Sequence, residues 1–167
     1  MNRSNHVAIV TAIALFAGIM AAGVHAQSDG KHAAQVKAAI KEMMAESAKM
    51  GTPKLEGMAL MFGATKINGN YALVDALKEK HKCTATFFAR KGDGFIRVAT
   101  NVIKDDGSRA VGTVLDPKGP AIAKISKGEA YYGIADILGK KYETGYEPVR
   151  NAAGEIIGVY YIGYLME

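Results

Sequence analysis

The sequence contains no tryptophan and a single cysteine, Cys83, among its 167 residues. One cysteine excludes an intramolecular disulfide, so the hydrophobic core must hold the fold together. A lone thiol can be a reactive group or can bridge two chains. Because Cys83 opens the segment Cys-Thr-Ala-Thr-Phe-Phe, which is typical of a strand, we predict a buried and unreactive thiol.

Catalytic and cofactor-binding motifs are also missing. Only His32 and His81 follow residue 26, and the chain has no covalent haem motif, His-Glu-x-x-His, nucleophile elbow or phosphate loop. His81 and Cys83 supply at most two metal ligands, too few for a structural zinc site. We therefore expect no enzyme, no cofactor and no metal. A noncovalent haem or metal is the alternative, and a Soret band in the absorption spectrum would reveal the haem.

Charge is absent from the first 28 residues except at Arg3. An apolar run from Val7 to Val24 follows, and the small-residue site Val24-His25-Ala26 ends it. This order is typical of a secretory signal peptide, so we predict residues 1–26 as a signal peptide and a periplasmic location. Because the run is close to the ~20 residues that span a bilayer, a single uncleaved membrane anchor is the alternative.

Residues 27–167 are long enough for one domain with a substantial core. The whole chain has a formal net charge of +5 at pH 7, but its basic residues alternate with acidic ones and form no run. Without a basic patch we expect no nucleic-acid partner.

Helical periodicity predicts a long first helix over residues 29–50 and a second from Tyr71 to about His81, capped by Asn70. The methionines of the first helix recur at core spacing, so we interpret them as core residues. Between these helices the pattern is weaker, and a short helix is expected around residues 55–61.

From residue 83 the sequence period changes to that of strands. Six are expected, at Cys83–Arg90, Phe95–Ile103, Arg109–Leu115, Glu129–Leu138, Tyr142–Arg150 and Glu155–Leu165. A short helix is expected before Gly128, with Asp116 as its cap and Pro117 in its first turn. Short turns between strands imply an antiparallel sheet.

The last of these strands has no polar alternation, so both of its faces must be covered. The long first helix can cover one face. The short helix and loops can cover the other incompletely, which would leave a pocket.

Several segments together resemble the Cache family of extracytoplasmic sensor domains, in particular the single-Cache and Cache 3/Cache 2 type of bacterial chemoreceptors. They are residues 95–102, 106–116, 128–133, 145–150 and 154–159, and the resemblance covers about residues 68–166. It implies an α+β, PAS-like fold with a five- or six-stranded antiparallel sheet and a long N-terminal helix. It also implies a small-molecule ligand, often a carboxylate or an amino acid, bound between sheet and loops.

In the receptors, the final strand continues into a second transmembrane helix, whereas this sequence ends at Glu167. The expectation is therefore a stand-alone periplasmic module for sensing or signal transduction, with a membrane receptor or sensor kinase as its partner. The alternative is an accessory interaction subunit that docks on a membrane sensor. Residues 54–63 would form its docking surface, because their apolar side chains exceed what a core is expected to absorb.

Three residues are candidates for ligand binding: Arg97, Tyr131 and Tyr146. Period two places Phe95, Arg97, Ala99 and Asn101 on one face of a strand. A buried guanidinium requires an anionic partner. A ligand carboxylate is one choice, because a guanidinium binds it in a bidentate manner.

A salt bridge to Glu143, Glu147 or Glu155, or a position at the surface, is the alternative for Arg97. Tyr131 and Tyr146 lie in strands whose counterparts line the pocket in the sensors that the sequence resembles. A phenol suits a pocket wall because it is apolar with one polar end. Tyr160, Tyr161 and Tyr164 are expected to pack in the core.

Overall fold

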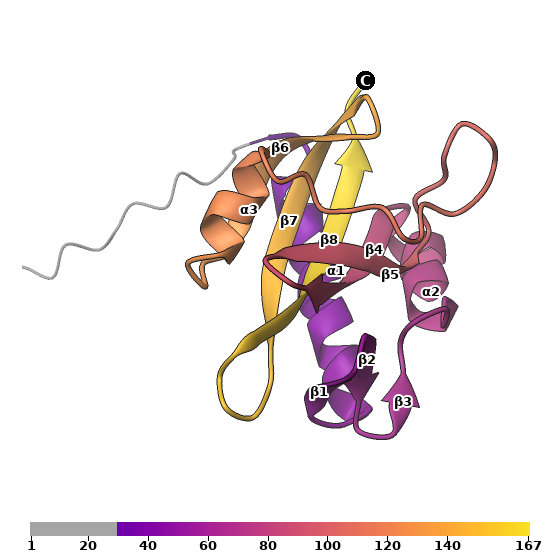
Figure 1. Cartoon of the computed structure of the whole chain (residues 1–167). Coiled ribbons are helices and arrows are strands. Elements are labelled where there is room, and N and C mark those ends of the chain that lie inside the picture. The colour runs from indigo at the N-terminus through magenta and orange to yellow at the C-terminus, as the bar shows by residue number, and fades with distance from the viewer. Residues whose placement is uncertain (1–29) are drawn as a thin grey trace, which may run out of the picture.

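The computed structural model describes residues 30–167, so the expected signal peptide and its cleavage site lie outside the described residues. Figure 1 shows a central antiparallel sheet with helices against it. Its strands are β4 (Thr84–Lys91), β5 (Gly94–Thr100), β6 (Tyr131–Ile137), β7 (Lys140–Arg150) and β8 (Ile156–Leu165). They lie in the order β5-β4-β8-β7-β6, and all neighbours are antiparallel. The sheet confirms the predicted α+β, PAS-like class with five strands.

Two helices lie where the periodicity placed them. The helix α1 (Ala33–Lys49) packs on β7 and β8. It buries Ile40 and Met43, which agrees with the prediction that Met43 is a core residue. The helix α2 (Ala72–His81) packs on β4 and α1. The predicted cap is wrong by one residue, because Tyr71 is the N-cap of α2 and makes no side-chain cap hydrogen bond. Asn70 precedes it, and its Oδ1 accepts a hydrogen bond from the backbone N–H of Ala72 at 3.2 Å in a local turn.

The central strand β8 is covered on both faces, as its sequence predicts, and only its two end residues are not buried. Tyr160, Ile162 and Tyr164 join a core cluster with α1 and α2. Val159 and Tyr161 join a second cluster, to which α3 (Pro120–Ile125) contributes Ala121 and Ile125. The alternation of side chains along β8 thus separates a face covered by two helices from a face covered by one short helix and loops.

The segment 52–69 differs from its expected short helix. It forms a small antiparallel sheet of β1 (Pro53–Glu56), β2 (Ala59–Phe62) and β3 (Thr65–Lys66). Gly57 and Gly63 have positive φ angles of 60° and 57°, which permit the two tight turns between these strands. The leucine and methionine residues suggested a helix, but these turns impose strands.

The described residues Arg109–Leu115 do not form the predicted strand. Only isolated bridges form there, Ile96 to Val114 and Ile103 to Arg109. The segment is a loop that runs along the edge of β5, with Gly112 in a turn at a φ of 82°.

The short helix begins later than expected. Gly119 is the N-cap of α3 and Pro120 is its first residue, so Asp116 and Pro117 precede the helix. Asp116 instead closes a turn, because its Oδ1 accepts a hydrogen bond from the backbone N–H of Lys118 at 2.9 Å.

The strand β5 carries an irregularity that affects the candidate site. Phe87 pairs with Ala99 but Phe88 pairs with Arg97, so Val98 is an extra residue opposite β4. Phe95 therefore lies in the α3-side cluster, whereas Ala99 lies in the cluster under α1 and α2. The expectation of one shared face for residues 95 to 101 is right for Phe95 and Arg97 and wrong beyond the bulge.

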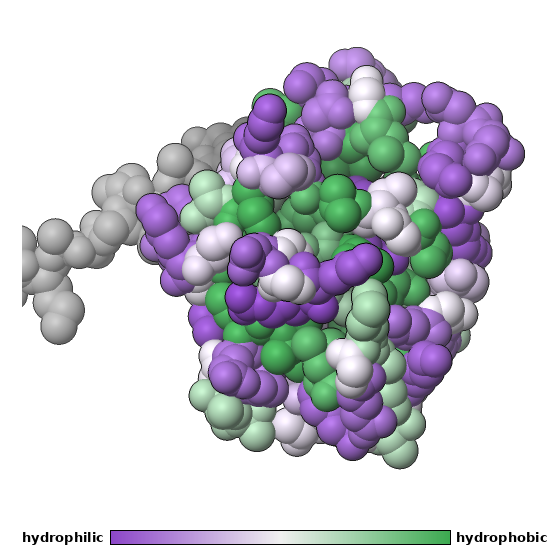
Figure 2. Space-filling view, in the orientation of Figure 1, coloured by the Kyte–Doolittle hydropathy of each residue, from purple (hydrophilic) through white to green (hydrophobic). Residues whose placement is uncertain are grey.

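Within residues 30–167, no helix combines the length and apolar character needed to cross a membrane. Figure 2 shows hydrophobic residues exposed between hydrophilic ones in the middle of the face seen in Figure 1. The exposed large apolar side chains include Ile103, Val111 and Val114, which lie in the loop beside β5.

Candidate ligand-binding site

A cavity of about 250 Å³ opens on the α3 side of the sheet. Residues of the loop before α3, of α3 itself, of β5 and of β6 and β7 line it, among them Arg97, Leu115, Ala135, Ile137 and Tyr146. The sequence predicts incomplete cover on this face of the sheet, the one that the short helix and loops cover. The cavity is of a size for a metabolite with few heavy atoms, since sites for drug-sized ligands are larger.

Arg97 brings a positive charge into this cavity. Its side chain is buried, with 5% of its surface exposed. The guanidinium lies over the ring of Phe88, with Cζ 4.9 Å from the ring centroid. Burial lowers the pKa of Arg97, while the nearby phenols of Tyr161 and Tyr146 act in the opposite direction. An arginine still remains charged at neutral pH, so this is a buried cation.

The hydrogen bonds of Arg97 are incomplete. Nη1 donates to the Oγ1 of Thr113 at 2.7 Å, but the buried Nε has no hydrogen-bond partner among residues 30–167. Arg97 takes part in none of the ion pairs that form within the same residues. A buried charge without an anion is costly, and an unsatisfied donor adds to that cost.

The three glutamates considered as partners of Arg97 have other contacts. The Oε2 atom of Glu143 accepts a hydrogen bond from the backbone N–H of His32, at the start of α1. Glu147 accepts one from the hydroxyl of Tyr132, and Glu155 one from the side chain of Asn151. The structure therefore does not support the salt-bridge alternative for Arg97.

The two candidate tyrosines occupy different positions. Tyr146 is buried and lines the cavity, and burial raises the pKa of its phenol. Tyr131 pairs with Tyr146 across the β6–β7 ladder, and their ring centroids are 6.1 Å apart. The hydroxyl of Tyr131 donates to the backbone oxygen of Ile134 at 2.8 Å. The fold thus brings Arg97 and Tyr146 to the same cavity, whereas Tyr131 does not line it and packs against the ring of Tyr146.

The loop that forms one wall of the cavity also pairs with β5. The backbone N–H of Arg97 donates to Thr113, that of Gly112 donates to Arg97, and that of Leu115 donates to Phe95. The Oγ1 atom of Thr113 in turn donates to the backbone oxygen of Ala110 at 2.7 Å. These bonds hold the wall against the strand that carries Arg97.

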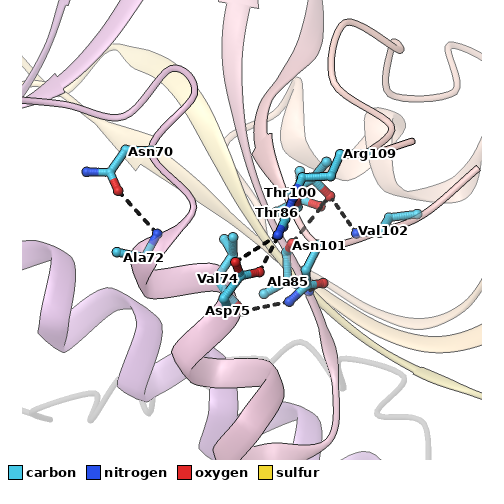
Figure 3. Close-up of polar contacts among 10 residues, drawn as sticks. All are labelled: Asn70, Ala72, Val74, Asp75, Ala85, Thr86, Thr100, Asn101, Val102 and Arg109. Carbon is cyan, nitrogen blue, oxygen red and sulfur yellow. Dashed lines mark hydrogen bonds and ion pairs between the residues drawn. The ribbon is translucent and has the colours of Figure 1, made fainter. Parts of the chain in front are cut away.

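The far end of the same loop is fixed on α2 (Figure 3). Arg109 donates to both carboxylate oxygens of Asp75 at 2.8 Å and to the backbone oxygen of Thr100 at 2.8 Å. Its guanidinium also stacks on Tyr71, 4.3 Å from the ring centroid. Because the pair is partly exposed, it positions the loop more than it stabilises the fold.

Asn101 forms a second connection at the start of this loop (Figure 3). It is buried; its Oδ1 accepts from the backbone N–H of Ala85 at 2.8 Å, and its Nδ2 donates to the backbone oxygen of Val74 at 2.6 Å. The side chain therefore ties β4 to α2 at the point where β5 ends.

Asp116 is a cavity residue that the sequence pattern did not identify. It lines the cavity from the loop before α3. The Asp-Pro dipeptide is a strong local signal for a helix cap, and this signal concealed its position at the cavity. Only the fold, which bends residues 110–119 back over β5, shows it.

A second hollow, of about 300 Å³, lies between the end of α2 and the ends of β7 and β8. Its charged residues, Lys78, Glu79 and Lys82, are all exposed. It has no buried charge that needs a ligand, so we take the cavity at Arg97 as the candidate site.

The apolar segment 54–63 is largely absorbed by the core. Leu60 and Phe62 are buried, whereas Met58 is 53% exposed. The apolar excess that suggested a docking surface for an accessory subunit is therefore smaller than the sequence indicated.

Cys83 is buried, as predicted, and its Sγ is 3.7 Å from the backbone oxygen of Leu77. Burial raises the pKa of the thiol to about 11. A raised pKa lowers the thiolate fraction at any pH below it, and the thiolate is the reactive form. We expect Cys83 to react with a disulfide reagent at pH 8 at least about tenfold more slowly in the native protein than in guanidinium chloride. Equal rates in the two conditions would show that the thiol is accessible.

The side chain of His81 contacts Glu42. Its Nε2 is 2.9 Å from the Oε2 of Glu42, and this oxygen also accepts a hydrogen bond from Nζ of Lys80. These side-chain hydrogen bonds, the one from Lys80 first, lower the pKa of Glu42. In the part of the chain that the structure describes, no cluster of three or more His, Cys, Asp or Glu residues could bind a metal ion.

An antiparallel sheet of this order, with one long helix against it and a cavity between sheet and loops, is a PAS-like α+β fold. The chain belongs to the Cache 3/Cache 2 fusion domain family, whose family model matches residues 21–167. Cache domains are extracytoplasmic sensor domains that take small-molecule ligands.

Comparison with solved structures gives a further similarity. The sensor domain of E. coli DcuS is similar to this chain with a TM-score of 0.46 and 16% sequence identity, over 78% of this chain and 90% of that one. No curated protein sequence matches this chain.

Proposed function

We propose that this domain is a periplasmic sensor module that binds a small carboxylate or an amino acid in the cavity at Arg97. The observation that carries the proposal is the unpaired, buried guanidinium that lines a cavity. A ligand carboxylate would supply the missing anion and could accept from the unsatisfied Nε.

The cavity walls fit such a ligand. Leu115, Ala135 and Ile137 provide apolar surface, and the Tyr146 phenol offers one polar atom beside the guanidinium. A mostly apolar cavity with few polar groups is the usual form of a small-molecule site. Tyr131 supports Tyr146 in this arrangement through ring packing.

A sensor domain must also change its conformation outside the cavity when a ligand binds. The loop residues Val114–Asp116 form a cavity wall, and the loop continues back to Arg109, which is bound to α2. A ligand that draws this loop toward Arg97 would act on both the sheet and α2. We propose a membrane receptor or sensor kinase as the partner that receives this change.

A thermal-shift screen of residues 27–167 tests the proposal. The probes are acetate, propionate, pyruvate, L-lactate, succinate, L-malate, citrate and the twenty amino acids, each at several concentrations. A ligand that binds the native state at 100 times its Kd adds about 2.7 kcal/mol to stability, which raises Tm by several degrees. If no probe raises Tm, the cavity does not serve carboxylates.

A further inference from the structure

The cavity at Arg97 also carries negative charge at its rim. Asp116 lines it from the loop before α3, and Asp136 lines it from β6. Both aspartates are exposed, whereas Arg97 is buried. The site therefore has one cation at depth and two carboxylates near its opening.

The two aspartates differ in their contacts. Asp136 Oδ1 accepts from the backbone N–H of Gly139 at 2.7 Å, and its Oδ2 lies 3.8 Å from Nζ of Lys141. Asp116 Oδ1 accepts from Lys118, but its Oδ2 takes no hydrogen bond or ion pair from residues 30–167. Asp116 is therefore the carboxylate with an oxygen available to a ligand.

Arg97 and Asp116 line the same cavity without forming an ion pair. Both charges lie near the Tyr146 phenol. Its pKa is raised mainly by burial, and Arg97 lowers it while Asp116 raises it. Because these two opposite charges line one small cavity and are not paired with each other, a single ligand can contact both.

We propose that the ligand is an amino-bearing carboxylate, an α-amino acid in the simplest case. Its carboxylate binds Arg97 and its ammonium group binds Asp116. The inference rests on the proposed function, because it takes Arg97 as the carboxylate anchor. It goes further by making Asp116 the residue that determines ligand class.

The same charges disfavour other carboxylates. A dicarboxylate on Arg97 would bring its second negative group toward Asp116 and Asp136, and this repulsion acts in a site partly shielded from water. A simple monocarboxylate would leave the Asp116 oxygen without a cation. An amino acid avoids both losses, so the arrangement selects for it.

Matched ligand sets test this inference by calorimetry. Each set has one carbon skeleton: L-alanine with propionate, L-valine with 3-methylbutanoate, L-leucine with 4-methylpentanoate, and L-aspartate with succinate. We expect at least one amino acid to bind at least about tenfold more tightly than its partner without the amino group, as a charge-assisted hydrogen bond implies.

The variant Asp116→Asn should reduce that ratio to about one, mainly by weakening the amino acid. Asparagine can still accept the hydrogen bond from Lys118, so the turn is retained. Asp93→Asn makes the same charge change in the exposed β4–β5 turn, outside the cavity, and should leave the ratio unchanged.

The outcomes separate the two proposals. Equal or tighter binding of the carboxylates that lack the amino group overturns the inference and leaves the carboxylate site in place. A preference for the amino acid that persists in Asp116→Asn overturns the role of Asp116. If no member of any set binds but another carboxylate of the thermal-shift panel does, the inference fails and the proposed function stands. If nothing in either panel binds, both fail.

Discussion

Replacing Arg97 with methionine is expected to lower the affinity for a carboxylate ligand by at least about 30-fold while leaving the unliganded domain as stable as before, or more so. The loss of affinity follows from removing one partner of a buried, hydrogen-bonded charge pair, which typically costs 2–5 kcal/mol, or about 30-fold to several thousandfold. Calorimetry with any ligand found by the thermal-shift screen would measure it.

The stability of the unliganded variant follows from the contacts of Arg97. Methionine removes a buried cation and the unpaired Nε. The Oγ1 of Thr113 keeps its bond to Ala110, and a thioether can pack on the ring of Phe88. Replacing a buried charge with an apolar side chain of similar length is often neutral or stabilising.

Two further variants complete this experiment. Arg97→Lys keeps the charge but loses the planar fork, so it should bind more weakly than the native protein and more tightly than Arg97→Met. Arg90→Met makes the same substitution at an exposed position outside the cavity and should bind normally. Unchanged affinity in Arg97→Met, or a large loss of stability, would show that Arg97 serves the fold instead.

Replacing Asn101 with leucine is expected to lower the free energy of unfolding by about 3 kcal/mol. The substitution keeps the branched shape and the number of heavy atoms of the side chain but removes the acceptor for Ala85 and the donor to Val74. The backbone N–H of Ala85 would then be buried without a partner, because Asn101 and its surroundings exclude water. Urea denaturation would measure the loss, and Tm should fall by about 10 °C.

Asn68→Leu is the matched control. Asn68 makes the same pair of bonds, accepting from the backbone N–H of Leu60 at 2.8 Å and donating to the oxygen of Met58 at 3.0 Å. It lies in the turn after β3 with partial access to solvent. Water can replace both bonds there, so the loss should be about 1 kcal/mol or less. Equal losses for the two variants would contradict the importance of burial at Asn101.

The sequence predicted the five strands of the main sheet because turns and period-two patterns are local. It failed where two different local patterns competed. Leucine and methionine at residues 55–61 suggested a helix, yet the turns at Gly57 and Gly63 produce strands. The alternating segment Arg109–Leu115 suggested a strand, yet the turn at Gly112 allows only scattered pairing with β5.

The candidate site was predictable in part. Arg97 could be identified as a charge among apolar neighbours, and its burial follows from the alternation of β5. The bulge at Val98 could not be read from the sequence, because it depends on the register with β4. Asp116 was missed for a similar reason. Its local signal is a helix cap, whereas its place at the cavity depends on how the loop packs against a distant strand.

The loop that forms the cavity wall has a second consequence, for association between chains. An edge strand with free backbone groups is a template for pairing with another molecule. Here the edge strand β5 is partly covered, because Gly112, Thr113 and Leu115 bond to the backbone of Phe95 and Arg97. Changes that release this loop from the Asp75–Arg109 pair would open the edge as well as the cavity. Empty, loosened protein would then be the form most prone to aggregate.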